Sequence, residues 1–164
     1  MKIKKTALLG LCLALAMIFS YVESLFPLTA GIPGIKMGLP NVITVYLLYR
    51  FGIKEAAAVS FTRVFLSALL FGNLFSLIYS LSGAVLSLAV MGGLKKSGLF
   101  RIPAVSVSGA VSHNLAQILA AMIIIGFKEI LYYLPYLILS GVLSGVLIGV
   151  LAALFIDRFK GVEA

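Results

Sequence analysis

The sequence predicts an all-α integral membrane protein, a compact bundle of six transmembrane helices. Three observations predict this fold class: of 164 residues, 62% are hydrophobic, only 11% are charged, and the mean hydropathy is +1.19. Soluble domains carry roughly 25% charged residues. A chain this apolar has too little polar surface to form a water-facing shell, so we expect a lipid bilayer around it.

Apolar segments of the chain account for the six helices, because a helix that crosses the hydrocarbon core needs about 20 mostly apolar residues. The expected spans are 6–26, 39–51, 54–71, 72–92, 102–125 and 131–156. The second is short, and the third and fourth almost touch at Gly72 and Asn73. The loops are too short for another domain, so residues 1–164 form a single membrane domain.

The first span resembles a signal peptide, because lysines precede an apolar stretch. This stretch continues to about Phe26, and no small-x-small cleavage site precedes a soluble domain. We therefore expect a retained first helix.

Basic residues predict the orientation of the bundle. The chain has 13 Lys and Arg against five Asp and Glu, a formal charge of +8. With the N-terminus inside, only Lys36 and Lys128 face outward, and Arg63 lies within a span. The cytoplasmic side receives Lys2, Lys4, Lys5, Arg50, Lys54, Lys95, Lys96, Arg101, Arg158 and Lys160. This positive-inside asymmetry predicts a multi-pass protein of the cytoplasmic (inner) membrane with both termini in the cytoplasm.

No basic run of the chain is interleaved with aromatic residues, so the excess positive charge does not indicate nucleic-acid binding. The lone Cys12 excludes a disulfide within the chain and a cysteine-based metal cluster. We expect no nucleic-acid partner, no metal and no cofactor.

Small residues four positions apart mark two helices, and such residues allow close helix contact in lipid. The last span carries Gly141, Gly145 and Gly149, for which packing within the bundle is favoured. The first span carries Gly10 and Ala14. For this pair, packing within the bundle and docking of another membrane subunit both stay open.

Arg63 lies near the middle of the third span. An arginine there costs at least ~2.5–3.5 kcal/mol on insertion scales, so it faces the bundle interior or a wet cavity. Glu23, near the outer end of the first span, is the best available partner for an ion pair. Structural pairing with Glu23 and contact with a ligand both remain open for Arg63.

Three hydrogen-bonding side chains share the fifth span: His113, Asn114 and Gln117. In an apolar helix they must find partners, because no water is available in the bilayer core. Ligand binding, proton relay and helix packing remain open, whereas a metal site would need ligands that the sequence lacks.

The fourth span carries a polar stripe with a spacing of three or four residues, which places its members on one helix face. Its members are Asn73, Ser76, Ser80, Gly83 and Ser87. Beside His113 and Arg63, this stripe indicates a polar cavity, with Ser80 as a candidate ligand contact.

The loop "PGIKMGLPN", residues 33–41, precedes the second span at its outer end. Pro40 suits the start of a helix, and Asn41 suits the cap or first turn. Free N–H groups at a helix start attract anions. We expect Lys36 and Asn41 at the rim of an outward-facing anion pocket with Arg63 deeper. The alternative is that Lys36 only extends to outer lipid headgroups.

Four stretches, "PGIKMGLPNVITVYLLYRFG", "SYVESLFPL", "YSLSG" and "SHNLAQ", together resemble the Gx transporter family. Many members of this family are labelled heptaprenyl diphosphate synthase component I. The resemblance covers nearly the whole chain, and the family is similar to the S components of energy-coupling factor vitamin transporters, which are small six-helix membrane proteins.

The resemblance implies a membrane subunit that takes up a small, anionic or amphipathic molecule, such as a vitamin or a quinone or isoprenoid precursor. It also implies an ATPase pair and a membrane coupling subunit as partners. The family label implies the alternative, a non-catalytic accessory subunit in prenyl-quinone or isoprenoid biosynthesis or in a membrane redox assembly. A self-sufficient proton-coupled carrier, with His113 as the proton relay, is a third interpretation.

The acidic residues of this polypeptide are too few and too scattered for it to act alone as a prenyl diphosphate synthase. Prenyl chain elongation requires aspartate-rich motifs that hold Mg²⁺ against a diphosphate, and Mg²⁺ prefers carboxylate oxygens. The chain has one aspartate, Asp157, and four scattered glutamates. It also lacks a P-loop motif, so we expect a protein that is not an enzyme.

Overall fold

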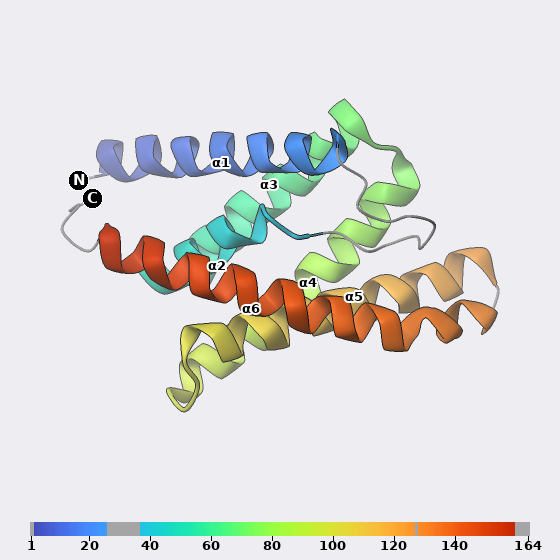
Figure 1. The fold of residues 1–164 in the computed structure, drawn as a ribbon. Coiled ribbons are helices and arrows are strands. Elements are labelled where there is room, and N and C mark those ends of the chain that lie inside the picture. The colour runs from blue at the N-terminus through green and yellow to red at the C-terminus, as the bar shows by residue number, and fades with distance from the viewer. Residues whose placement is uncertain (1, 26–36, 127, 160–164) are drawn as a thin grey trace.

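The computed structural model of the chain describes residues 2–25, 37–126 and 128–159. Within these ranges the chain forms six α-helices and one short 3₁₀ helix, with no strand (Figure 1). The predicted all-α class is therefore confirmed. The elements are α1 Lys2–Leu25, α2 Asn41–Arg50, α3 Ile53–Phe71, α4 Leu74–Ser97, α5 Ile102–Ile125, η1 Lys128–Tyr133 and α6 Leu134–Arg158.

Among the residues that the structure describes, four helices are long and apolar enough to cross a membrane, namely α1, α4, α5 and α6, the last together with part of η1. The expected six full spans are not confirmed. Helix α2 has 10 residues, about 15 Å of helix, which is half of the roughly 30 Å hydrocarbon core. Helix α3 has 19 residues but carries three charged side chains, Lys54, Glu55 and Arg63.

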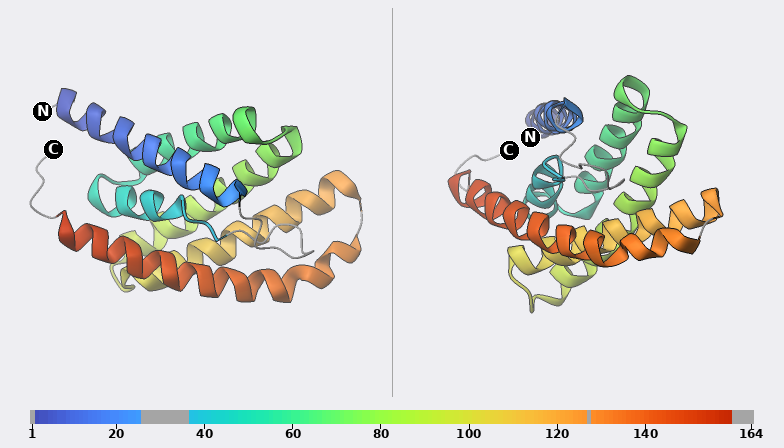
Figure 2. Two further views of the ribbon diagram at one scale, coloured as in Figure 1. Left: turned by 45° about the horizontal axis from the view of Figure 1, so that its top comes forward. Right: turned by 45° about the vertical axis from the view of Figure 1, so that its right-hand side comes forward.

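Neighbouring helices in the chain pack against one another. Helix α5 packs along both α4 and α6, while α3 contacts α1, α2 and α4. The beginning of α1 and the end of α6 lie at the same end of the bundle (Figures 1 and 2).

Between α3 and α4, the Asn73 side chain accepts a hydrogen bond of 2.8 Å from the Ser76 N–H and so caps α4. The chain therefore turns where Gly72 and Asn73 are expected to separate two helices.

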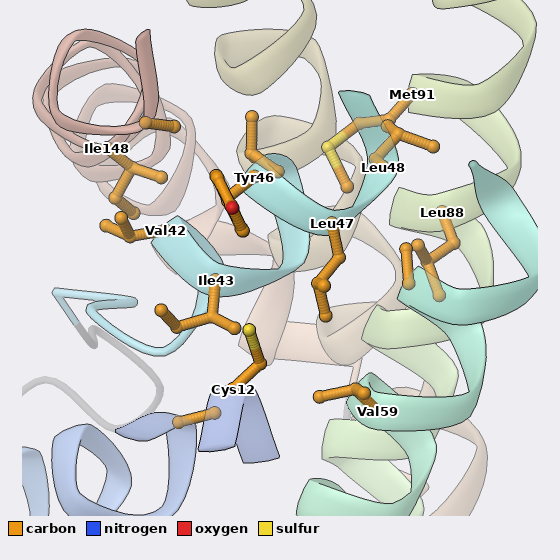
Figure 3. Close-up of a cluster of buried hydrophobic side chains, with 14 of the residues drawn as sticks. Cys12, Val42, Ile43, Tyr46, Leu47, Leu48, Val59, Leu88, Met91 and Ile148 are labelled. Carbon is orange, nitrogen blue, oxygen red and sulfur yellow. The ribbon is translucent and has the colours of Figure 1, made fainter. Parts of the chain in front are cut away.

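Helix α2 forms the centre of the core (Figure 3). All seven side chains from Val42 to Leu48 are buried. A helix that is apolar on every side is stable only when other elements surround it. The surrounding helices supply Cys12 from α1, Val59 from α3, Leu88 and Met91 from α4, and Ile148 from α6.

The glycines of α6 lie against the backbone of α5. A Cβ at Gly145 would come within 2.6 Å of the Val107 Cα, and one at Gly149 within 2.6 Å of the Pro103 Cα. A Cβ at Gly141 would come within 3.0 Å of the Asn114 Nδ2. The missing side chains therefore permit the close approach of these two helices.

Candidate functional site

The start of α2 is a turn stabilised by its own backbone. The N–H groups of Asn41, Val42 and Ile43 donate to the carbonyls of residues 38, 39 and 40, over 2.8, 3.1 and 3.2 Å. The expectation of free N–H groups at this helix start is therefore wrong for these three residues. Such i→i−3 bonds tighten a helix end and satisfy donors that would otherwise be open to an anion. Asn41 is the first helical residue, and no side chain caps the helix.

Glu23 of α1 holds the segment that leads into α2. Its carboxylate oxygen Oε1 accepts a hydrogen bond of 2.5 Å from the Gly38 N–H. Gly38 has φ +72°, a left-handed conformation that glycine adopts without steric cost. Pro40, two residues later, is fully buried. The end of α1 and the start of the core helix are thus connected by a charge-assisted hydrogen bond.

Arg63 of α3 lies beside the same part of α1. Its Nη1 is 3.4 Å from the Ser20 Oγ, at the long limit for a hydrogen bond. Its Nε is buried and has no hydrogen-bond partner among the described residues. Glu23 lies near enough for its negative charge to favour the charged guanidinium, and the ion pair of these two residues stays a prediction. Ser20, Glu23 and Arg63, with Gly38, are called the arginine cluster below.

His113 of α5 packs against α4. A Cβ at Gly83 would lie 2.6 Å from both Cε1 and Nε2 of the imidazole, so the ring occupies the space that a side chain at position 83 would fill. At a second contact the glycine is on α5 and the side chain is on α4, because a Cβ at Gly109 would lie 2.5 Å from Cγ of Met91. Gly83 and Ser87, two members of the polar stripe of α4, thus face α5.

The remaining polar candidates lie along α4 and α5. Asn114 donates a hydrogen bond of 2.7 Å from Nδ2 to the Leu137 carbonyl and so connects α5 to the start of α6. Gln117 and Ser80 are half-buried. Among the described residues, no group of three or more His, Cys, Asp or Glu side chains is placed to hold a metal ion.

The structure therefore separates the predicted polar residues into two groups. The arginine cluster lies between α1, α3 and the segment before α2. His113 and Asn114 lie at the contacts of α5 with α4 and α6. Helix α4 packs against α3, which carries Arg63, and against α5, which carries His113. Lys36 lies outside the described residues.

The small-residue face of α1 is open. Gly10 and Ala14 are exposed, and a Cβ at Gly10 would meet no atom within 4 Å. This is the opposite of the α6 glycines, which lie against α5. Small residues with the same four-residue spacing are thus exposed on α1 and packed against another helix on α6.

The sequence did not predict a role in the polar contacts for Ser20, Gly38 or Tyr49. Ser20 precedes Glu23 by three residues, which places both on one helix face, so its position near Arg63 could have been expected. The contact of Glu23 with the Gly38 N–H joins segments that are 15 residues apart, and no sequence pattern predicts it. The Tyr49 hydroxyl is buried and has no hydrogen-bond partner among the described residues.

Comparison with known proteins relates the chain to one family. Residues 12–155 match the family described as heptaprenyl diphosphate synthase component I. No curated protein and no solved structure matches the chain. The label expected from the sequence resemblance is confirmed. Because the match extends over most of its length, this chain belongs to the heptaprenyl diphosphate synthase component I family.

Proposed function

We propose that the chain is a substrate-binding subunit of a membrane transport system, which takes up a small anionic or amphipathic molecule. The observation that carries this proposal is the buried Nε of Arg63, which has no hydrogen-bond partner among the described residues. A guanidinium has five N–H donors, and leaving one unsatisfied in an apolar bundle is costly. A carboxylate or phosphate oxygen of a ligand satisfies it.

The depth of the cluster in the bilayer supports the same function. In the proposed orientation both termini are cytoplasmic, and the end of α2 at Arg50 lies at the inner interface. Since α2 is about 15 Å long, its start then lies about halfway across the hydrocarbon core. Discontinuous helices of transporters place substrate sites at this depth. Arg63, near the middle of α3, lies at a similar depth, and Glu23, near the outer end of α1, contacts Gly38 on the outer side of that start.

Glu23 also restricts the chemistry of the ligand. Its negative charge partly compensates Arg63, so the cluster suits a ligand with one anionic group and an apolar remainder. We propose Asn41, at the start of α2, as a further contact inside the bundle and Lys36 as a contact at the outer rim. Ser80, His113 and Gln117 remain proposed contacts on the α4–α5 side, while Asn114 positions the helices there through its bond to Leu137.

The open face of α1 gives a place for a partner. Gly10 and Ala14 are exposed, and nothing in the described chain covers Gly10. Small residues allow a foreign helix to approach the backbone closely. We propose that a membrane coupling subunit with an ATPase pair docks on this face and supplies the energy for uptake.

The family name favours a second candidate function. The words "component I" imply another synthase component as partner. In this alternative the chain is a non-catalytic membrane subunit in isoprenoid or prenyl-quinone biosynthesis. The α1 face then binds the other component, and Arg63 with Glu23 only holds the bundle together.

Co-purification separates the two functions. The tagged full-length chain is extracted from its own membrane in a mild detergent, and its partners are identified by mass spectrometry. Recovery of an ATPase pair with a coupling subunit supports transport, whereas recovery of prenyl-synthase or electron-transfer enzymes without an ATPase rejects it.

A matched pair of variants tests the docking face. Ala14→Leu enlarges an exposed residue of the open α1 face, and Ala104→Leu makes the same change at an exposed position of α5. Loss of partners with Ala14→Leu and not with Ala104→Leu places the partner on α1. Equal recovery with both variants contradicts the proposed docking face.

A further inference from the structure

An open groove lies on the surface at the end of the bundle where α2 ends, α3 begins and α4 ends. Its volume is about 450 Å³, and its lining residues are Leu48, Ile53, Gly92, Gly93, Lys95 and Lys96. It is called the lysine groove below. The groove lies apart from the arginine cluster and shares no residue with it.

The glycines on α4 leave one wall of the lysine groove open. A Cβ at Gly93 would meet no atom within 4 Å, whereas one at Gly92 would meet the Ile53 side chain at 2.5 Å. Ile53 therefore lies directly on the α4 backbone, and the space beside it at Gly93 is free. Ile53, whose side chain is 46% exposed, makes this part of the groove apolar, which suits a hydrocarbon chain.

The other part of the lysine groove is cationic. The Lys95 Nζ donates a hydrogen bond of 2.6 Å to the Leu48 carbonyl and lies 5.3 Å from the centre of the Tyr49 ring. One of its three N–H donors is used in this bond. Lys96 is exposed. Within the described residues, neither lysine is paired with a carboxylate, since Glu55 of the adjoining helix pairs with Lys5 at 2.6 Å.

We propose that the lysine groove binds an anionic phospholipid of the inner leaflet, with its phosphate at Lys95 and Lys96 and an acyl chain along Ile53 and the open position at Gly93. The groove is complementary to both parts of such a lipid, since its cationic rim suits the phosphate and its apolar wall suits the acyl chain. In the proposed orientation this end of the bundle faces the cytoplasm, where anionic headgroups meet basic pockets between helices. Lysine binds phosphate as a compact point charge.

The test is native mass spectrometry of the full-length protein in a neutral detergent, titrated with phosphatidylglycerol or phosphatidylcholine. We expect phosphatidylglycerol to bind at least fivefold more tightly. Lys96→Gln weakens its binding about fivefold, the effect of one lysine near an anionic surface. Gly93→Leu, which fills the apolar part, abolishes binding of both lipids. Lys4→Gln changes nothing, since Lys4 is exposed on α1 and lies outside the groove.

Three results overturn the proposal. Equal affinity for the two lipids removes the phosphate contact, and unchanged binding in both Lys96→Gln and Gly93→Leu removes the groove itself. Displacement of the lipid by an equal concentration of inorganic phosphate or of a prenyl diphosphate, with the same sensitivity to Lys96→Gln, assigns the groove to a different occupant. Circular dichroism of Lys96→Gln and Gly93→Leu confirms that each variant is folded.

Discussion

Replacing Gly145 by alanine tests how closely α5 and α6 are packed. The added Cβ would lie 2.6 Å from the Val107 Cα, 3.1 Å from its nitrogen and 3.2 Å from the Ala110 Cβ. Optimal carbon–carbon contact lies at about 3.5–4.0 Å, so the helices must separate by about 1 Å. The nearest atoms belong to the backbone, and no change of rotamer removes them.

The expected cost of Gly145→Ala is therefore about 2–3 kcal/mol, the upper part of the range for overpacking. For a chain of this size this corresponds to a fall of about 4–12 °C in the unfolding midpoint. The assay is thermal unfolding in detergent, followed by circular dichroism. Gly10→Ala is the control, because its Cβ meets no atom within 4 Å, and its midpoint stays equal or rises. Equal midpoints for the two variants would refute the close packing of α5 on α6.

Two further contacts give predictions of different size. Gly83→Ala places a Cβ 2.6 Å from the His113 ring and destabilises the folded protein by about 1–2 kcal/mol. In a His113→Ala background most of this loss disappears, and a double-mutant cycle without coupling would contradict the packing of His113 on Gly83. Lys5→Ala removes an ion pair whose side chains are 42% and 21% exposed, so the free energy of unfolding falls by less than about 1 kcal/mol; a loss as large as that of Gly145→Ala would show that this pair has a larger role than its exposure implies.

The long helices were predictable because their apolar length alone decides that they form in lipid. Helices α1, α4, α5 and α6 follow the expected spans within a few residues, apart from the four added at the start of α1 and the five added at the end of α4. The role of α2 was not predictable from its length. A 10-residue apolar segment is too short to cross a bilayer, and only the contacts with the other helices make it the centre of the core.

The composition of the arginine cluster was partly predictable. The cost of a charge in the membrane pointed to a partner for Arg63, and Glu23 was the acid at a suitable depth. The separation of Arg63 from His113 was not predictable, because in lipid the apolar faces of helices carry no information on which helices are neighbours. The anion site of free N–H groups failed because the turn from residue 38 to residue 43 satisfies its own donors.

The central claim is that Arg63 binds an anionic small molecule inside the bundle, and native mass spectrometry of the protein purified from its own membrane tests it most directly. The wild-type chain and Lys4→Gln, a change at an exposed lysine of α1, are expected to retain one small anionic molecule. Arg63→Gln, which keeps two N–H donors but removes the charge, is expected to lose it while remaining folded. A molecule retained equally by the wild type and Arg63→Gln, or none retained by the wild type, would contradict the account.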